Sequence, residues 1–302
     1  MPMKLSQLRI LVALHESGSL QETSRRLHIS QPALSRALKE LEDELGVPLL
    51  ARSNKGASLT PYGVSLLGHA RSALESVRRA RQDIDDMRGQ TGQEVRIGLT
   101  TMASLLDPVQ SAIAAFHLEH PQVRLTVLEQ RPPQVQDLMQ QGALDFALTS
   151  LIPAQTTSME WLPICRKGMG VFARRGHPLA NARHLRQLSG ATWVCQDAPD
   201  NPNSVIYRLF EQNRMQVPPN AIECGAAQLV GKLILEADAL FVGLDEAPSY
   251  LVQWMQRVQL EEKIPDSFIG ILCPDRRLLT RMAAKLFDAM REALLARYPR
   301  FE

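Results

Sequence analysis

The chain has 302 residues, of which 45% are hydrophobic, and it carries a formal net charge of +2 at pH 7. A chain of this length is too long for one ordinary hydrophobic core, so more than one domain is expected. Because the charge is only mildly basic, a protein that coats nucleic acid through bulk charge is excluded, and any DNA site must be local.

The first sixty residues predict three short helices and a small β wing. Residues 6–17, 19–28 and 30–46 each open on a serine that can cap a helix, and a glycine closes the first and the third. Pro32 is tolerated in the third helix because the N–H that proline lacks would have no helical partner in a first turn. Residues 47–60 place two short apolar pieces around a turn-forming polar run, which predicts a hairpin.

One long helix is predicted from Pro61 to about Arg88, because Thr60 can cap it and no further proline follows until Pro108. Apolar residues recur along it in steps of three and four, interrupted by Arg81: Leu67, Ala70, Leu74, Val77 and Ile84. The helix either lies on its own domain or pairs with its copy in a second chain. At about thirty residues without an obvious second apolar face, pairing is the favoured interpretation.

Beyond a hinge of glycine and glutamine residues at 90–93, strands alternate with helices. Strands are predicted at 95–99, 123–128, 145–149, 170–173, 192–195, 221–224, 240–243 and 268–273. Helices are predicted from the end of the first strand to about residue 120, and at 134–141, 205–214, 228–237 and 280–297. Such alternation implies α/β sheets that are mostly parallel, with binding crevices at the carboxyl ends of the strands.

The strongest functional signal is the start of the third helix, Ser30-Gln31-Pro32-Ala33-Leu34-Ser35-Arg36. In a helix-turn-helix this helix enters the major groove, where Gln31 can make a bidentate contact to adenine and nearby basic residues can reach phosphates. The predicted DNA contacts are Arg25, Arg26, Ser30, Gln31, Pro32, Ser35, Arg36, Lys39, Arg52 and Lys55. A charged helix bundle without DNA is disfavoured, because caps, turn, buried leucine stripe and wing all agree.

At these residues the chain resembles the LysR family of transcription regulators. The family's pattern is matched by Thr23-Ser24, Leu27, Ser30-Gln31-Pro32-Ala33, Ser35, Leu41-Glu42 and Leu45-Gly46, and it continues through 48–52 and 59–63. Residues 142–148 and 176–180 resemble family markers of the second half more loosely. The chain departs from the family at 237–240, where glycines are usual, and at 244–245, where a proline is common.

The resemblance implies an α/β protein in three parts: a winged helix-turn-helix at 1–60, a linker and dimerisation helix at 61–89, and an effector-binding domain at 90–302. That last domain would be similar to a periplasmic binding protein, with lobe I at about 92–165 and 267–302 and lobe II at about 166–266. The residues then expected to bind an effector between the lobes are Thr100, Thr101, Met102, Thr149, Ser150, Gln196, Asp197, Ser204, Gly225, Val242, Gly243 and Phe268.

Thr100 and Thr101 come directly between a predicted strand and a predicted helix. At such a junction hydroxyls and free helix N–H groups can receive an anion. The alternative is that both threonines only cap the helix. The predicted effector is therefore a small organic anion.

The predicted function is a sequence-specific transcription regulator whose binding to DNA or activity responds to that anion. The expected partners are a double-stranded DNA operator, the effector, further copies of the chain in a dimer and then a tetramer, and RNA polymerase. No cofactor, metal or membrane partner is expected.

Two rival functions use the same fold. The first is an enzyme or solute carrier, but His177 has no evident partner base and Gly168-Met169-Gly170 lacks the third glycine of a dinucleotide fingerprint, so no catalytic residue is predicted. The second is a DNA-binding protein without an effector. Stabilisation by a ligand would exclude this second rival.

The expected location is the cytoplasm. The start, Met1-Pro2-Met3-Lys4-Leu5, lacks the apolar run of a secretory signal, and no later stretch approaches membrane-spanning length. The cysteines, Cys165, Cys195, Cys224 and Cys273, are scattered and form no Cys-x-x-Cys motif. They predict buried, inert thiols rather than a zinc site or a disulfide framework, with a redox switch as the alternative.

Overall fold

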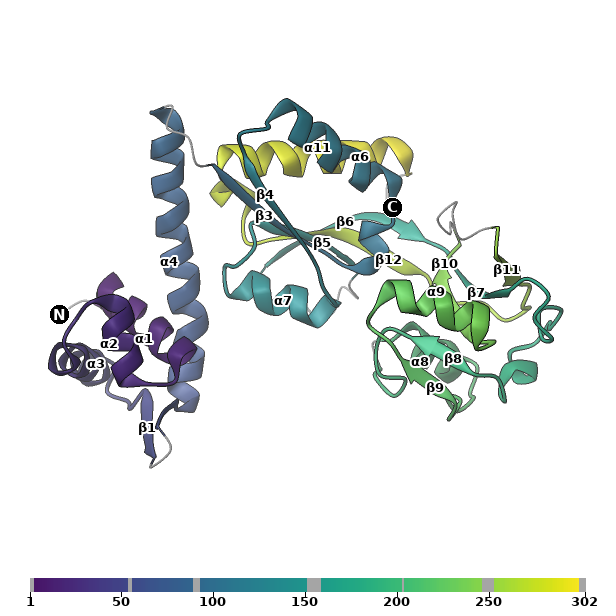
Figure 1. The fold of residues 1–302 in the computed structure, drawn as a ribbon, viewed down its shortest axis with the longest axis horizontal. Coiled ribbons are helices and arrows are strands. Elements are labelled where there is room, and N and C mark those ends of the chain that lie inside the picture. The colour runs from purple at the N-terminus through teal and green to yellow at the C-terminus, as the bar shows by residue number, and fades with distance from the viewer. Residues whose placement is uncertain are drawn as a thin grey trace.

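The computed structural model describes residues 3–53, 56–88, 93–150, 159–202, 204–245 and 253–298. An N-terminal helical domain leads into one long helix, α4, which is followed by two separate β-sheets with helices packed against them (Figure 1). Within these residues no helix is both long and apolar enough to cross a membrane.

The N-terminal domain confirms the predicted helices and wing. It contains helices α1 (Leu5–Ser17), α2 (Leu20–Leu27) and α3 (Gln31–Leu45), then a hairpin of strands β1 (Leu50–Ser53) and β2 (Gly56–Leu59). Its core is built from Ile10, Leu11, Leu14, Leu34 and Leu38. Because the leucines of α3 point into this core, the opposite face of α3 is left to the solvent.

Two of the three predicted caps are present. Ser19 and Ser30 cap α2 and α3, each accepting a hydrogen bond from a backbone N–H three residues on. The prediction that Ser6 caps the first helix is wrong, because α1 begins one residue earlier. There the side chain of Gln7 accepts a hydrogen bond from the backbone N–H of Lys4 at 2.9 Å.

Helix α4 spans Pro61–Met87 and is capped by Thr60, whose hydroxyl oxygen accepts a backbone N–H at 3.1 Å. Leu67 and Ala70 are buried where α4 packs against α1. The first residues of the predicted apolar stripe on α4 therefore pack against the N-terminal domain of the same chain. At the far end Ile84 is 51% exposed.

The first sheet, in lobe I, has the strand order β4-β3-β5-β12-β6. Its strands are β3 (Glu94–Leu99), β4 (Arg124–Glu129), β5 (Phe146–Ser150), β6 (Glu160–Lys167) and β12 (Ser267–Cys273). Strands β3, β4 and β5 are parallel, whereas β12 runs antiparallel to both β5 and β6.

The second sheet, in lobe II, has the strand order β11-β7-β10-β8-β9. Its strands are β7 (Met169–Arg174), β8 (Trp193–Cys195), β9 (Ala221–Glu223), β10 (Leu240–Leu244) and β11 (Met255–Val258). Strands β8, β9 and β10 are parallel, and β7 runs antiparallel to β10 and β11.

The prediction of mostly parallel sheets is wrong, because both sheets are mixed, and strands β6 and β11 were not predicted. The chain passes from lobe I to lobe II between β6 and β7 and returns between β11 and β12. A returning strand such as β12 starts at the junction of the lobes, where β5 ends, so it must run opposite to β5.

Helices cover both faces of the lobe I sheet. Helices α6 (Asp107–Glu119) and α11 (Arg281–Arg297) lie together on one face and α7 (Pro132–Gln140) lies on the other (Figure 1). The predicted single helix to residue 120 is split into α5 (Thr101–Ser104) and α6, because Pro108 sits in a first turn and starts a new helix. The remaining helices in the described part of the chain are α8 (Val205–Gln212), α9 (Ala227–Glu236) and two 3-10 turns at Leu185–Leu188 and Arg276–Leu278.

Each lobe has its own aromatic pair in the core. Phe146 and Phe287 meet edge to face in lobe I, with ring centroids 5.5 Å apart. Trp193 and Phe210 do the same in lobe II at 5.4 Å. Such pairs stabilise a fold beyond the area they bury, and both pairs belong to one continuous cluster of buried apolar residues.

A buried ionic cluster joins α4 to lobe I. Arg79 of α4 is 5% exposed and its Nη2 donates a hydrogen bond to a backbone carbonyl of lobe I at 3.0 Å. Glu75, one turn earlier, accepts hydrogen bonds from Arg78 and from Arg96 of β3. Asp145, 1% exposed, accepts the backbone N–H of Arg96 at 2.8 Å. The helix that carries the N-terminal domain is thus attached to lobe I through charged groups.

Candidate functional site

The start of α3 presents a polar face to the solvent. The exposed residues of this face are Ser30, Gln31, Pro32, Ser35, Arg36 and Lys39. Leu34 and Leu38, on the opposite side of the helix, are buried. A helix divided in this way can enter a DNA groove while it stays attached to its core.

The other predicted DNA contacts lie on α2 and the wing. Arg25 and Arg26 are exposed, and each forms a salt bridge with a glutamate of its own domain, at 3.2 and 2.6 Å. Exposed pairs of this kind contribute little free energy, so either arginine can exchange its carboxylate for a phosphate. Arg52 lies in β1 with its side chain outside the described part of the chain, and Lys55 lies outside the described residues altogether.

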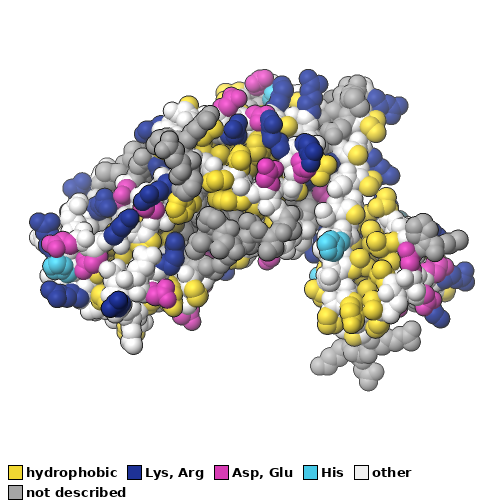
Figure 2. All heavy atoms as spheres, turned by 180° about the vertical axis from the view of Figure 1, so that it is seen from behind, with side chains coloured by type: hydrophobic (Ala, Val, Ile, Leu, Met, Phe, Trp, Pro, Cys, Tyr) yellow, Lys and Arg dark blue, Asp and Glu magenta, His cyan; other side chains and the backbone are white. Residues whose placement is uncertain are grey.

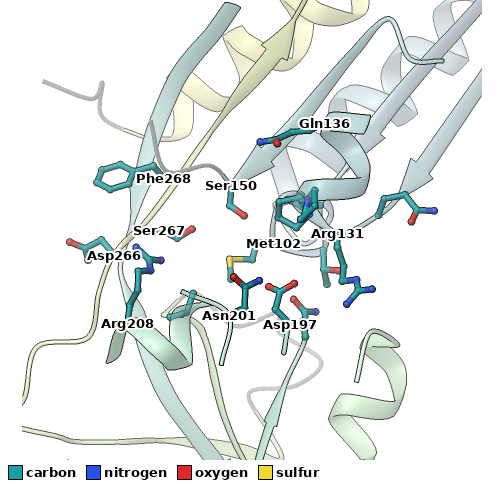
Figure 3. A pocket seen from close by; sticks show the side chains of 17 residues that line it. Met102, Arg131, Gln136, Ser150, Asp197, Asn201, Arg208, Asp266, Ser267 and Phe268 are labelled. Atoms are coloured by element: carbon teal, nitrogen blue, oxygen red, sulfur yellow. The ribbon is translucent and has the colours of Figure 1, made fainter. Parts of the chain in front are cut away.

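A second candidate site lies between the lobes, in a cavity of about 110 Å³ that is partly open to solvent. A concave space between two lobes, lined by apolar side chains and a few polar and charged ones, is a usual place for a small ligand. Lobe I and the strand returning to it contribute Thr100, Thr101, Met102, Gln130, Arg131, Pro132, Pro133, Gln136, Ser150, Asp266, Ser267 and Phe268. Lobe II contributes Gln196, Asp197, Asn201, Val205 and Arg208. We call this space the interlobe cavity (Figure 3).

Many of the residues predicted for the effector meet in this cavity. Those that line it are Thr100, Thr101, Met102, Ser150, Gln196, Asp197 and Phe268. Most of them lie at or just beyond the end of a strand, whereas Phe268 lies near the start of one. Gly225 lines a neighbouring hollow, which also includes Thr101 and Arg131.

Four predicted residues line neither space. Thr149 is fully buried within β5, opposite β12. Ser204 is buried and its hydroxyl caps α8. Val242 and Gly243 lie inside β10, where they pair with β7. The structure thus brings together the residues at strand ends rather than those within strands.

The hydroxyls of Thr100 and Thr101 have different surroundings. Thr100 is 2% exposed, and its Oγ1 neither caps α5 nor has a hydrogen-bond partner in the described residues. Thr101 Oγ1 donates a hydrogen bond to Glu129 at 2.8 Å. Helix capping therefore accounts for neither hydroxyl. Because an unpartnered buried hydroxyl costs free energy, Thr100 is suited to bond a molecule in the cavity.

Arg208 is a cation of the interlobe cavity without a countercharge. It is half-buried on α8, its Nε has no hydrogen-bond partner, and it forms no ion pair with any residue that the structure describes. Burial lowers its pKa from the ordinary value, although a guanidinium stays charged in proteins. The side chain reaches from α8 toward Ser267 on the other side of the cavity (Figure 3).

A salt bridge connects the two lobes at the edge of the cavity. Arg131, which follows β4 in lobe I, donates a hydrogen bond from Nη1 to Glu223 of lobe II at 3.0 Å. Both side chains are nearly half exposed. The bridge can therefore break at little cost if the lobes move apart.

The sequence prediction missed Gln130, Arg131, Pro132, Pro133, Gln136, Asn201, Val205, Arg208, Asp266 and Ser267. One of these could have been found, since Arg131 comes just after β4 ends, as Thr100 does after β3.

The thiols lie in the interior of the described structure. All four cysteines are buried and free of disulfides. Burial raises the pKa of Cys195 and of Cys273 to about 11, and since the thiolate is the reactive form, these two are unreactive near neutral pH. No group of His, Cys, Asp and Glu that could hold a metal ion occurs in the part of the chain that the structure describes.

Two family models match the chain. "Bacterial regulatory helix-turn-helix protein, lysR family" matches residues 5–64, and "LysR substrate binding domain" matches residues 88–295. The chain belongs to the LysR family. The exposed face of α3 lies within the first match, and the interlobe cavity lies within the second.

Curated relatives of this LysR-family chain are transcriptional regulators. It is 30% identical over 244 residues to the HTH-type transcriptional regulator GbpR of Azospirillum brasilense. The matched segment covers 80% of this chain and 71% of GbpR. The chain is 30% identical over 237 residues to the HTH-type transcriptional regulator GalR of Pseudomonas putida, covering 78% of this chain and 59% of GalR.

Solved structures of full-length regulators share the fold. A full-length OxyR variant from Pseudomonas aeruginosa superposes with a TM-score of 0.65 at 19% identity, over 98% of this chain and 95% of OxyR. Full-length CbnR in complex with its target DNA gives a TM-score of 0.61 at 18% identity, over 96% of this chain and all of CbnR. This LysR-family chain is a DNA-binding transcription regulator with an effector-binding domain.

Proposed function

We propose that this regulator responds to a small organic anion bound in the interlobe cavity, with Arg208 as the charge partner of that anion. The observation that carries the proposal is the half-buried guanidinium of Arg208, which has an unbonded Nε and shares its cavity with the unpartnered hydroxyl of Thr100. A buried charge without a partner costs free energy, and a carboxylate can meet a guanidinium in a bidentate pair.

The two groups also give binding a mechanical consequence. Thr100 belongs to lobe I and Arg208 to lobe II. An anion that bonds both stabilises the arrangement in which the lobes are close together, and it shifts the population toward that arrangement. The Arg131–Glu223 bridge favours the same arrangement.

The signal then has a physical route to the DNA. Lobe I holds α4 through Arg79, Glu75 and their partners in β3 and near β5. A change in the position of lobe I therefore acts on α4 and on the N-terminal domain at its other end. At the DNA, Gln31 and Arg36 would read base edges, whereas Lys39, Arg52 and Lys55 would contact phosphates.

The same proposal includes self-association through α4, as a dimer that pairs into a tetramer. Tyr62, Val64 and Ile84 are exposed apolar side chains of α4, and hydrophobic side chains show on the surface of this part of the molecule in Figure 2. A two-fold dimer would set two recognition helices about 34–36 Å apart on the duplex. Light scattering of the full chain tests this point, and a monomer at micromolar concentration would contradict it.

A thermal-shift screen of small carboxylates, sulfonates and sugar acids tests the proposed site. A ligand that binds only the folded protein must raise its melting temperature. We expect at least one anion to stabilise the wild type, Arg208→Gln to lose that stabilisation, and the exposed control Arg186→Gln to keep it. The proposal fails if no anion stabilises the protein, or if Arg208→Gln responds as the wild type does.

A further inference from the structure

The charged side chains that line the interlobe cavity are Arg131, Asp197, Arg208 and Asp266. Two of them are compensated by residues that do not line it: Arg131 by Glu223 at 3.0 Å, and Asp266 by Arg166. Because each of these pairs is neutral, neither leaves a charge for a ligand to neutralise.

Arg208 and Asp197 have no such partner among the described residues. Arg208 lies on α8, and Asp197 is half-buried just beyond β8, so both belong to lobe II. They form no ion pair with each other, and Figure 3 shows Asn201 between them. The cavity thus holds one positive and one negative side chain that form no ion pair in the described residues, and both belong to lobe II.

The surroundings of Asp197 agree with this interpretation of the charges. Burial raises the pKa of Asp197, against the opposing charge of Arg131 and with a further rise from Glu223. A raised pKa indicates a carboxylate whose negative charge is poorly compensated. A positive group placed beside Asp197 would therefore be stabilised.

We propose that the ligand is an aminocarboxylate whose carboxylate meets Arg208 and whose ammonium group meets Asp197. This inference rests on the proposed function, since it concerns the same cavity. A plain anion would compensate Arg208 but would add negative charge to a cavity that already contains Asp197. A ligand with both charges compensates the two residues at once, which removes the cost of burying either one alone.

The separation of the two residues restricts the ligand further. Because Figure 3 shows Asn201 between Arg208 and Asp197, a ligand whose ammonium and carboxylate groups stand at opposite ends of a short chain suits the two residues better than one that carries both groups on one carbon. Met102 and Phe268 line the same cavity and can contact the carbons of that chain. The class of ligand is therefore an ω-amino acid.

Calorimetric titration of the full-length protein tests this class with matched pairs of compounds. The pairs are 4-aminobutanoate with butanoate and 5-aminopentanoate with pentanoate, so each pair differs only in the amine. We expect the aminocarboxylate of at least one pair to bind about tenfold more tightly, as a charge-assisted hydrogen bond predicts. Asp197→Asn should abolish this preference and Asp200→Asn, an exposed control three residues away, should retain it. Melting temperatures without ligand verify that the variants fold.

The outcomes separate this inference from the proposed function. Equal affinities within each pair, or a preference that survives Asp197→Asn, would overturn the aminocarboxylate class. If the plain carboxylates bind and Arg208→Gln weakens their binding, the proposed anion site is supported even where the aminocarboxylate class is overturned. If neither kind of compound binds the wild type, this inference is overturned, and the broader anion screen decides the proposed function by itself.

Discussion

Thr100 and Thr149 lie next to each other where β3 and β5 end, because the backbone N–H of Thr100 donates to the carbonyl of Leu148 at 3.0 Å. Both hydroxyls are buried without a partner in the described residues. A ligand oxygen gains most from such a group, since the new hydrogen bond replaces none that already exists. Of the two, Thr100 lines the interlobe cavity.

We therefore expect Thr100→Val to weaken binding of the stabilising anion by about 1–3 kcal/mol, because valine keeps the branched shape and removes the hydroxyl. Thr101→Val is the matched control. Its effect should be smaller, since the hydroxyl of Thr101 is already bonded to Glu129. Calorimetry measures the anion affinity of both variants. Equal losses of affinity would show that the unpartnered hydroxyl of Thr100 contributes no more to binding than that of Thr101.

The sequence predicts a site residue well when its position at the end of a strand is enough to place it in the site. Thr100, Ser150 and Gln196 lie at or just beyond the ends of strands whose carboxyl ends meet at the junction of the lobes. Arg208 could not be placed by this rule because it is inside a helix and reaches the cavity only through the length of its side chain. Asp266 was missed because it precedes a strand that runs away from the cavity.

At the scale of elements, the contact between α4 and lobe I depends on buried charges. Arg79 lies 3.4 Å from the carboxylate of Asp145, which is 1% exposed. Burial raises the pKa of Asp145 despite the charges of Arg79, Arg78 and Arg96. A carboxylate held in this way depends on its arginine partners, because removal of one leaves a buried charge less compensated.

Arg79→Gln should therefore destabilise the full chain by about 3–5 kcal/mol, the usual cost of breaking a buried ion pair. The exposed Arg81→Gln on the same helix is the control, and it should change stability by less than about 0.5 kcal/mol. Urea unfolding measures both. If the two variants have equal stability, the ionic cluster does not hold α4 to lobe I.

Strands β6 and β11, which the sequence prediction missed, lack the regular hydrophobic pattern that marks a strand in a sequence. Strand β6 contains Pro163 and lies at the edge of its sheet, with a register shift where it meets β12 at Ile269 and Gly270. Proline is tolerated at an edge or bulge, but it disguises the strand in the sequence. Strand β11 (Met255–Val258) lacks the alternation of a strand, because its two polar residues stand together between the buried Met255 and Val258. Long periodic elements such as α4 and α11 were predicted within about two residues, the usual uncertainty at helix ends.

For the whole molecule, the two sites lie in different domains. Helix α3 lies near one end of α4, and the two sheets that carry the lobes follow the other end along the chain (Figure 1). Substitutions in one site should therefore leave the intrinsic affinity of the other unchanged while they remove the coupling between them. Effector binding and DNA binding should therefore be separable by substitution.

Fluorescence anisotropy measures the DNA affinity of each variant with and without the stabilising anion. The duplex for this titration is selected from random DNA by the full-length protein. Arg208→Gln should bind this duplex as the wild type does but no longer respond to the anion. Arg36→Ala should lose about 1–3 kcal/mol of discrimination against random duplex and keep its thermal stabilisation by the anion. If instead Arg208→Gln weakens DNA binding in the absence of the anion as much as Arg36→Ala does, the two sites are not separate and the account is contradicted.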